Sequence, residues 1–180
     1  AALRQVEREL ADPAALPSPG TSMLGSAGAA AGVSTGALAA LEQRWQGARK
    51  VALALAGLGA QKFGPAVEDE QEFLAAIADL VIALFATSSA LLRARKAAAV
   101  DPARAELHAA LARLYAADAF DRMELTARRL LPSLVTGDAL RVQLALLRRL
   151  LAGEAEDTVA LGRRVAQRVL EREGYPLGEW

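Results

Sequence analysis

The chain has 180 residues, and its 21 Lys and Arg balance its 21 Asp and Glu, so the net charge is zero. This length suits one domain or one domain with a tail, and the charge balance gives no general attraction for nucleic acid. The absence of cysteine excludes disulfides, thiolate metal sites and a cysteine nucleophile, and a single histidine excludes a three-histidine zinc site. Because 43 residues are Ala, 30 are Leu and only 4% are aromatic, the composition favours an all-α fold.

The first 36 residues differ from the rest of the chain. The sequence of residues 1–12 is typical of a helix, but no N-cap residue precedes it. We therefore interpret these residues as the end of an upstream helix, and the chain as a C-terminal piece of a larger protein. A processed N-terminus is the alternative. Residues 13–36 contain no charged residue and are rich in Pro and Gly, which predicts a flexible linker. It is too interrupted to cross a membrane.

An interfacial membrane segment is the alternative interpretation of this linker. Amphipathic segments bind a bilayer through apolar area together with attraction to anionic lipid. The apolar side chains and the basic residues that follow them would then be the candidate membrane contacts: Leu16, Met23, Leu24, Val33, Arg44, Arg49 and Lys50.

Residues 37–180 are predicted to form a helical bundle domain. Apolar residues recur at helical spacing over about residues 34–61 and 66–99. Asp101-Pro102 then predicts a cap and first position for a third long helix, which we expect to end before Pro132. Shorter helices are expected from about residues 136 and 154. The prediction is an up-and-down bundle of about four main helices plus short helices, preceded by a Gly/Pro-rich linker.

The same periodicity predicts which side chains face the core. We expect the following residues to be inward: Leu38, Leu41, Trp45, Ala48, Ala52, Leu55, Phe73, Ile77, Leu80, Val81, Leu84, Leu91, Leu107, Leu111, Leu114, Tyr115, Leu125, Leu140, Leu144, Leu147, Leu151, Val159, Ala166 and Val169. The uncharged run 80–92 is too short to span a bilayer.

A search for chemistry finds no catalytic, metal-binding or cofactor-binding residue. Gly57, Gly59 and Gly64 lack the strand and spacing of a phosphate loop. His108 is expected at the surface or half-buried in a helix, and Ser88-Ser89 are expected to bond back to the helix backbone.

Three arginine pairs, at 128–129, 148–149 and 163–164, lie in separate predicted helices. They would either form one basic face for anionic lipid or nucleic acid, or be balanced individually by nearby carboxylates. The neutral net charge favours the second arrangement, so no nucleic-acid partner is expected.

Leu41-Glu-Gln43, the run from Glu70-Gln-Glu-Phe to Arg93-Ala, and the ending Tyr175-Pro-Leu-Gly178 occur in this order after the linker. Together they resemble the extra C-terminal region of the very-long-chain acyl-CoA dehydrogenases and their complex-I-assembly relative, and Asp118 and Arg122 match an acid–arginine pair of that family. The resemblance covers about residues 41–180. Where the family has a tryptophan and a cysteine, this chain has Tyr115 and Ala116.

The resemblance implies a parent enzyme that carries FAD and oxidises acyl-CoA in fatty acid β-oxidation, with the catalytic glutamate in a Tyr-Glu-Gly motif upstream of the linker. No such motif occurs here, so this chain is expected to be a non-catalytic domain without its own cofactor. The implied partners are the catalytic body and a second subunit. The enzyme is expected to be cytoplasmic, and weak peripheral contact with a membrane is left open. The alternative is a helical partner-docking or effector-binding module unrelated to acyl-CoA chemistry.

Overall fold

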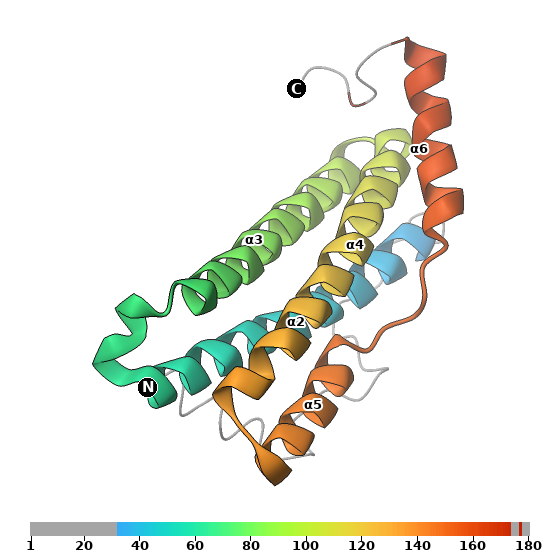
Figure 1. The fold of residues 1–180 in the computed structure, drawn as a ribbon. Coiled ribbons are helices and arrows are strands. Elements are labelled where there is room, and N and C mark those ends of the chain that lie inside the picture. Colours follow the sequence, from blue (N-terminus) through green and yellow to red (C-terminus); the bar gives the residue numbers. More distant parts are fainter. Residues whose placement is uncertain (1–31, 174–176, 178–180) are drawn as a thin grey trace.

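The computed structural model describes residues 32–173 and Leu177, and this part of the chain is helical throughout, without a strand. Its elements are α2 (Gly32–Phe63), the 3₁₀-helix η1 (Gly64–Asp69), α3 (Gln71–Val100), α4 (Pro102–Leu134), α5 (Gly137–Leu151) and α6 (Thr158–Arg172) (Figure 1). The predicted all-α bundle is confirmed. Residues 1–12 and most of the predicted linker lie outside the described residues.

Short connections determine how the helices pack. A single residue, Asp101, separates α3 from α4, so these two long helices run in opposite directions side by side (Figure 1). The helices α2, α3 and α4 each pack against the other two, and α5 lies against α2 and α4. Among the described elements α6 packs on α4 alone, and it projects beyond the three long helices.

The core between the long helices combines a few large side chains with many alanines. Phe120, Leu80, Met123 and Thr87 are almost completely buried. Alanines are also buried along the facing sides of α2, α3 and α4, for example Ala48, Ala94, Ala112 and Ala127. Small side chains at these positions let the helix axes approach closely, which explains how a chain so rich in alanine builds a packed interior.

Two glycines permit contacts that a larger residue would obstruct. A Cβ on Gly47 would lie 1.9 Å from the carbonyl oxygen of Leu150, where the end of α5 meets α2. A Cβ on Gly59 would lie 1.9 Å from the ring of Phe73, which is buried against α2. Gly59 therefore has a packing role inside a continuous helix, and it does not mark a loosened helix end.

Two helix boundaries differ from the prediction. The helix expected from residue 66 begins at Gln71, because residues 64–69 form η1 first. The helix expected to stop before Pro132 continues to Leu134. Proline removes only its own N–H donor, and the next bonds remain, such as that from Val135 N to the Leu131 carbonyl at 3.0 Å. Leu131 and Leu134 are buried in the core, and this burial holds the last turn.

Of the 24 residues predicted to face inward, 12 are buried, including Leu84, whereas 7 are half-buried and 5 are exposed. Val81 is 54% exposed and Leu125 is 49% exposed, although both were expected to face inward. Leu111 is half-buried rather than buried. The expected inward residues of the last helix, Val159, Ala166 and Val169, are all exposed, because α4 is the one described helix against which α6 packs.

Helix α3 carries apolar residues on both sides. Leu80, Leu84 and Leu91 face the bundle and are buried, whereas Ile82 and Phe85 are exposed. By length and composition the helix is apolar enough to cross a membrane, contrary to the expectation drawn from its uncharged run, and 17% of its most apolar stretch is buried. One such helix is weak evidence for a membrane span, since core helices of soluble proteins share these properties.

Candidate functional site

Arg44, a candidate membrane contact, joins three helices in the structure. Its Nε donates a hydrogen bond to the carbonyl of Leu151 at 2.9 Å, at the end of α5. Its guanidinium carbon lies 4.7 Å from the centre of the Phe120 ring, and Nη2 is 3.9 Å from Asp121 on α4. A bond to a terminal helix carbonyl and a cation–π contact both favour the charged group at this position. Arg44 therefore has a clear structural role.

The other candidate membrane contacts are not brought together with Arg44. Leu16, Met23 and Leu24 lie outside the described residues, and Val33 lies in the first turn of α2. Arg49 is exposed, and Lys50 is half-buried. The structure leaves Arg49 accessible to a lipid surface, and membrane contact by this set stays a prediction.

The residues considered as a nucleophile or a phosphate loop have structural roles within helices. Ser88 Oγ donates to the carbonyl of Phe85 at 2.8 Å, which confirms the expected backbone bond. Gly57 and Gly59 lie inside α2, and so they form no loop that could hold a phosphate. Within the described ranges, no group of three His, Asp or Glu could hold a metal ion.

His108 differs from the prediction, because it is only 4% exposed. Burial lowers the pKa of its imidazole below the ordinary value of 6.5, and the positive charges of Arg93 and Arg104 lower that pKa further. A neutral buried histidine beside two arginines is poorly suited to bind a cation. We interpret it as a core residue with a pH-dependent effect on stability.

A bidentate ion pair fixes the segment between α5 and α6. Arg113 Nε lies 2.8 Å from Glu156 Oε1, and its Nη2 lies 2.5 Å from Oε2. The hydrogen bonds that Arg113 donates to the Glu156 carboxylate raise the pKa of its guanidinium despite partial burial. This pair anchors the segment on α4, directly before α6 begins.

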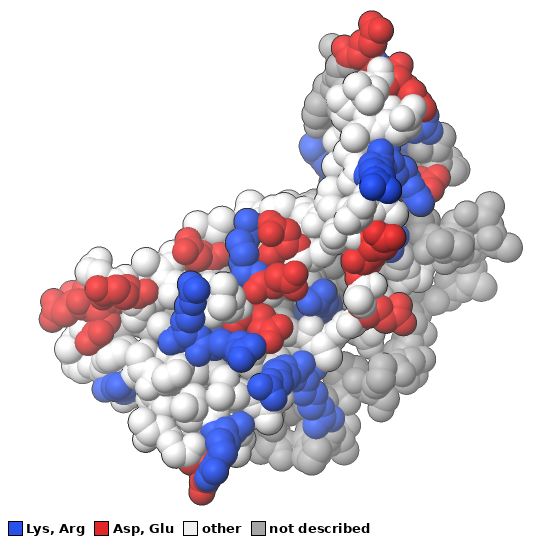
Figure 2. All heavy atoms as spheres, turned by 45° about the vertical axis from the view of Figure 1, so that its right-hand side comes forward, with Lys and Arg blue, Asp and Glu red and all other residues white. Residues whose placement is uncertain are grey.

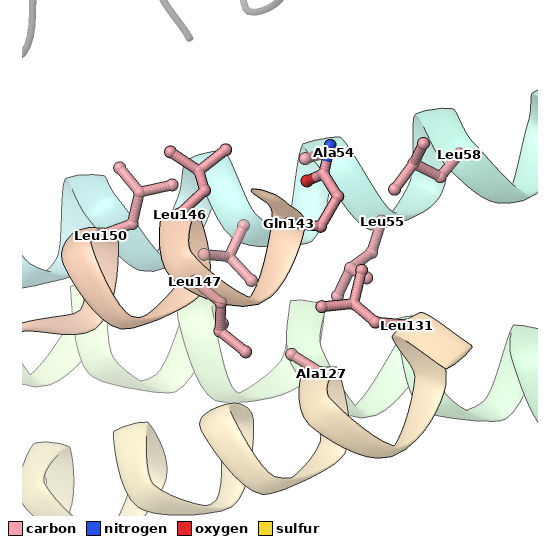
Figure 3. Close-up of a pocket in the computed structure, with 10 residues that line it drawn as sticks. Ala54, Leu55, Leu58, Ala127, Leu131, Gln143, Leu146, Leu147 and Leu150 are labelled. Atoms are coloured by element: carbon pink, nitrogen blue, oxygen red, sulfur yellow. The ribbon is translucent and has the colours of Figure 1, made fainter. Parts of the chain in front are cut away.

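A small apolar cavity lies where α5 packs on α2 and α4. Its volume is about 20 Å³, which is about the space of one water molecule. Figure 3 shows leucines of all three helices around it, including Leu55, Leu131 and Leu147, with Gln143 at one side. The cavity is a packing feature, and a flavin nucleotide does not fit it.

A larger open groove of about 320 Å³ runs between α3 and α4. Ile82 and Ala83 line one side, and Tyr115, Arg122 and Thr126 line the other. This groove adjoins the exposed apolar side of α3. Arg122 is 2.9 Å from Asp118, which confirms the predicted pair one turn apart. The mixed lining suits contact with another protein surface.

The charges do not form one basic face. Figure 2 shows Lys and Arg interspersed with Asp and Glu over much of the displayed side. Arg128 is 3.9 Å from Glu124, and Arg164 is 2.8 Å from Glu106. These contacts favour the arrangement in which carboxylates balance the arginines individually.

The sequence model of the family described as "Acyl-CoA dehydrogenase, C-terminal domain" matches residues 47–149, which cover most of α2 to α5. The chain belongs to the acyl-CoA dehydrogenase family. The family resemblance is thereby confirmed, and the helical domain described above corresponds to the family's C-terminal domain.

Two relatives place this domain within longer proteins. A Bacillus subtilis protein named "Probable acyl-CoA dehydrogenase" is 36% identical over 129 residues, which cover 71% of this chain and 22% of the relative. The crystal structure of an acyl-CoA dehydrogenase complexed with FAD from Bacillus anthracis matches with a TM-score of 0.79 and 30% identity, over 95% of this chain and 26% of the other. The chain thus spans about a quarter of the length of these acyl-CoA dehydrogenases.

The sequence prediction missed the feature that best suits a functional surface, namely the exposed apolar side of α3. A signal was present, because residues 80–92, the middle of the predicted helix 66–99, include no charged residue. A helix of that kind is normally buried on every side. Its second apolar side therefore indicates a partner that the described residues do not supply.

Proposed function

We propose that this chain is the non-catalytic C-terminal domain of an FAD-dependent acyl-CoA dehydrogenase of fatty acid β-oxidation, and that it packs against the catalytic body of that enzyme. The family match over α2 to α5, together with the quarter-length coverage of both relatives, carries this proposal. In the described residues the polar groups are used for packing and ion pairs. A docking role suits these features better than chemistry.

The cofactor belongs to the remaining part of the enzyme. FAD is bound in the Bacillus anthracis relative, but the described residues of this chain do not fit it. The pocket between α2, α4 and α5 holds only about 20 Å³, and the glycines near residue 57 lie within a helix rather than in a turn before a helix N-terminus. We therefore assign flavin binding and the catalytic glutamate to the part of the enzyme outside this chain.

The purified 180-residue chain tests this assignment. It is expected to be colourless and to leave acyl-CoA unoxidised with any electron acceptor, since it lacks the Tyr-Glu-Gly motif and a flavin site. The absorbance spectrum of the purified chain is the measurement. Flavin absorbance in a one-to-one ratio with the polypeptide would overturn the assignment.

The family match argues against the alternative, an effector-binding module unrelated to acyl-CoA, and the sequence encoded upstream of this chain tests the two directly. A Tyr-Glu-Gly motif shortly upstream of Ala1 supports the acyl-CoA dehydrogenase proposal. A helix-turn-helix motif at that place would support a transcription regulator instead.

Localisation, oligomeric state and membrane contact form a second part of the proposal. We propose a cytoplasmic, homodimeric enzyme with weak peripheral attachment to anionic membrane. Each accessible basic residue near an anionic surface contributes about 1 kcal/mol. Since Arg44 is engaged with Leu151 and Phe120, the basic contribution falls mainly to Arg49, which is exposed.

Sedimentation with anionic liposomes at low salt tests the membrane contact. The 180-residue chain should cosediment more than a chain that starts at Ala37, which lacks the apolar residues between 16 and 33. Equal amounts of both chains in the supernatant would contradict membrane attachment. The matched variant Arg49→Gln should reduce cosedimentation if this arginine contacts lipid.

A further inference from the structure

The side of α3 that faces away from the bundle has the properties of a protein interface. We define the outer face of α3 by five residues, which lie on one side of the helix: Leu74, Val81, Ile82, Phe85 and Leu92. Their exposed fractions range from 39% for Leu74 to 73% for Phe85. Contiguous exposed apolar patches of this kind usually mark an interaction site.

Charge occurs only at the borders of this face. Residues 80–92 contain no charged side chain, and Asp79 and Arg93 flank them. The groove beside the face adds the polar groups of Tyr115 and Arg122. An apolar centre with a polar rim and an adjoining groove is the arrangement of a protein–protein interface.

The charge distribution disfavours a lipid surface as the occupant. Glu70, Glu72 and Asp79 lie in or next to the first three turns of α3, and they would be repelled by anionic lipid. The basic residues Arg93 and Lys96 lie at the opposite end of the helix. The face therefore lacks the surrounding basic residues that hold a helix on a membrane.

We propose that the outer face of α3, with the adjoining groove, is the surface that docks on the catalytic body of the same polypeptide. This inference rests on the proposed function. The chain spans 22% and 26% of the relatives, so about three quarters of such an enzyme is attached to this domain. A tethered partner has a high effective concentration, whereas a second copy must associate from solution. This difference favours the body over a second copy.

Cysteine labelling tests the proposal, because the chain has no cysteine of its own. Phe85→Cys reports on the outer face, and Val142→Cys on α5, which is 62% exposed in the structure, is the matched control. Each variant is made in the 180-residue chain and in the longer enzyme, which is the polypeptide that contains both this domain and the proposed catalytic body. Maleimide labelling is followed by mass spectrometry of the peptide that contains the new cysteine, so that cysteines elsewhere do not interfere.

We expect position 85 to react about tenfold more slowly, or more slowly still, in the longer enzyme than in the 180-residue chain, because labelling then requires the domain to open. Position 142 should react similarly in both. Circular dichroism of each variant checks that the helices are intact.

Three results would overturn the docking surface. Equal labelling of position 85 in both proteins means that the body does not cover it. If labelling of position 85 slows in the 180-residue chain as its concentration rises, a second copy covers the face. Sedimentation velocity would then show the dimer. Protection only in the presence of vesicles assigns it to lipid.

The flavin spectrum of the same samples separates this inference from the proposed function. A longer enzyme without flavin refutes the proposed function, whatever the labelling shows. A flavin-containing enzyme in which position 85 labels freely refutes only the docking surface.

Discussion

At the scale of single residues, the core depends on a few large side chains set among many alanines. Phe120 is 1% exposed, and the Arg44 guanidinium stacks on its ring. Phe120→Ala should therefore lower the free energy of unfolding by about 3–5 kcal/mol, because it leaves a cavity and removes the surface on which Arg44 rests. Chemical denaturation followed by circular dichroism measures this change.

Leucines at two predicted core positions provide an internal comparison. Leu84→Ala should lower the free energy of unfolding by about 2–5 kcal/mol, since Leu84 is buried in the core of the bundle. Leu111→Ala should cost clearly less, because Leu111 is half-buried. An equal loss for both variants would contradict the burial seen in the structure.

His108 makes stability depend on pH. Its pKa is lowered in the folded state, so the unfolded chain binds this proton more readily below about pH 6.5. The neutral form therefore supports folding above that pH, and this support is lost as the pH falls. The difference in unfolding free energy between wild type and His108→Gln should shrink between about pH 7 and pH 5. A difference that stays constant over this range would contradict a lowered pKa.

At the scale of elements, two glycines in helices differ in the space available for a side chain. Gly47→Ala places a methyl group against the Leu150 carbonyl, so it should destabilise the protein by about 1–3 kcal/mol. Gly162→Ala in α6 is the matched control, because no atom lies within 4 Å of its added Cβ. That variant should stabilise the protein by about 0.5–1 kcal/mol. Thermal unfolding of both variants measures the contrast, and a neutral Gly47→Ala would contradict the close packing of α5 on α2.

The existence and order of the helices could be predicted from the sequence, because apolar residues recur at helical spacing over long segments. The side that each helix buries was harder to predict. On α3 both sides are apolar, so periodicity alone could not show that Val81 faces outward while Leu84 faces inward. On α6, the apolar residue Val159 is exposed, because among the described helices α6 packs against α4 alone. Periodicity within α6 could not show how few neighbours this helix has.

The candidate site was less predictable than the fold. Burial of His108 depends on the packing around α4, and no local pattern indicated it. The sequence placed Arg44 with the basic residues that follow the linker, whereas its partners are 107 residues away at Leu151 and on α4. Contacts between residues so distant in sequence are set by the tertiary fold, so they became visible only in the structure.

At the scale of the whole molecule, the described helices combine a packed core with an exposed apolar face on α3. The three long helices enclose the core, α5 closes one side, and the anchored segment before α6 leads to a helix that projects outward (Figure 1). This arrangement suits a domain that folds as a unit and then docks on a larger body. In the proposed enzyme, that body carries the flavin and the acyl-CoA site.

The anaerobic absorbance spectrum of the longer polypeptide, recorded before and after addition of acyl-CoA, tests this account most directly. We predict flavin bands in a one-to-one ratio with the polypeptide and loss of the oxidised-flavin absorbance when a suitable acyl-CoA is added. A longer polypeptide that contains no flavin, or a flavin that no acyl-CoA of any chain length reduces, would contradict the account.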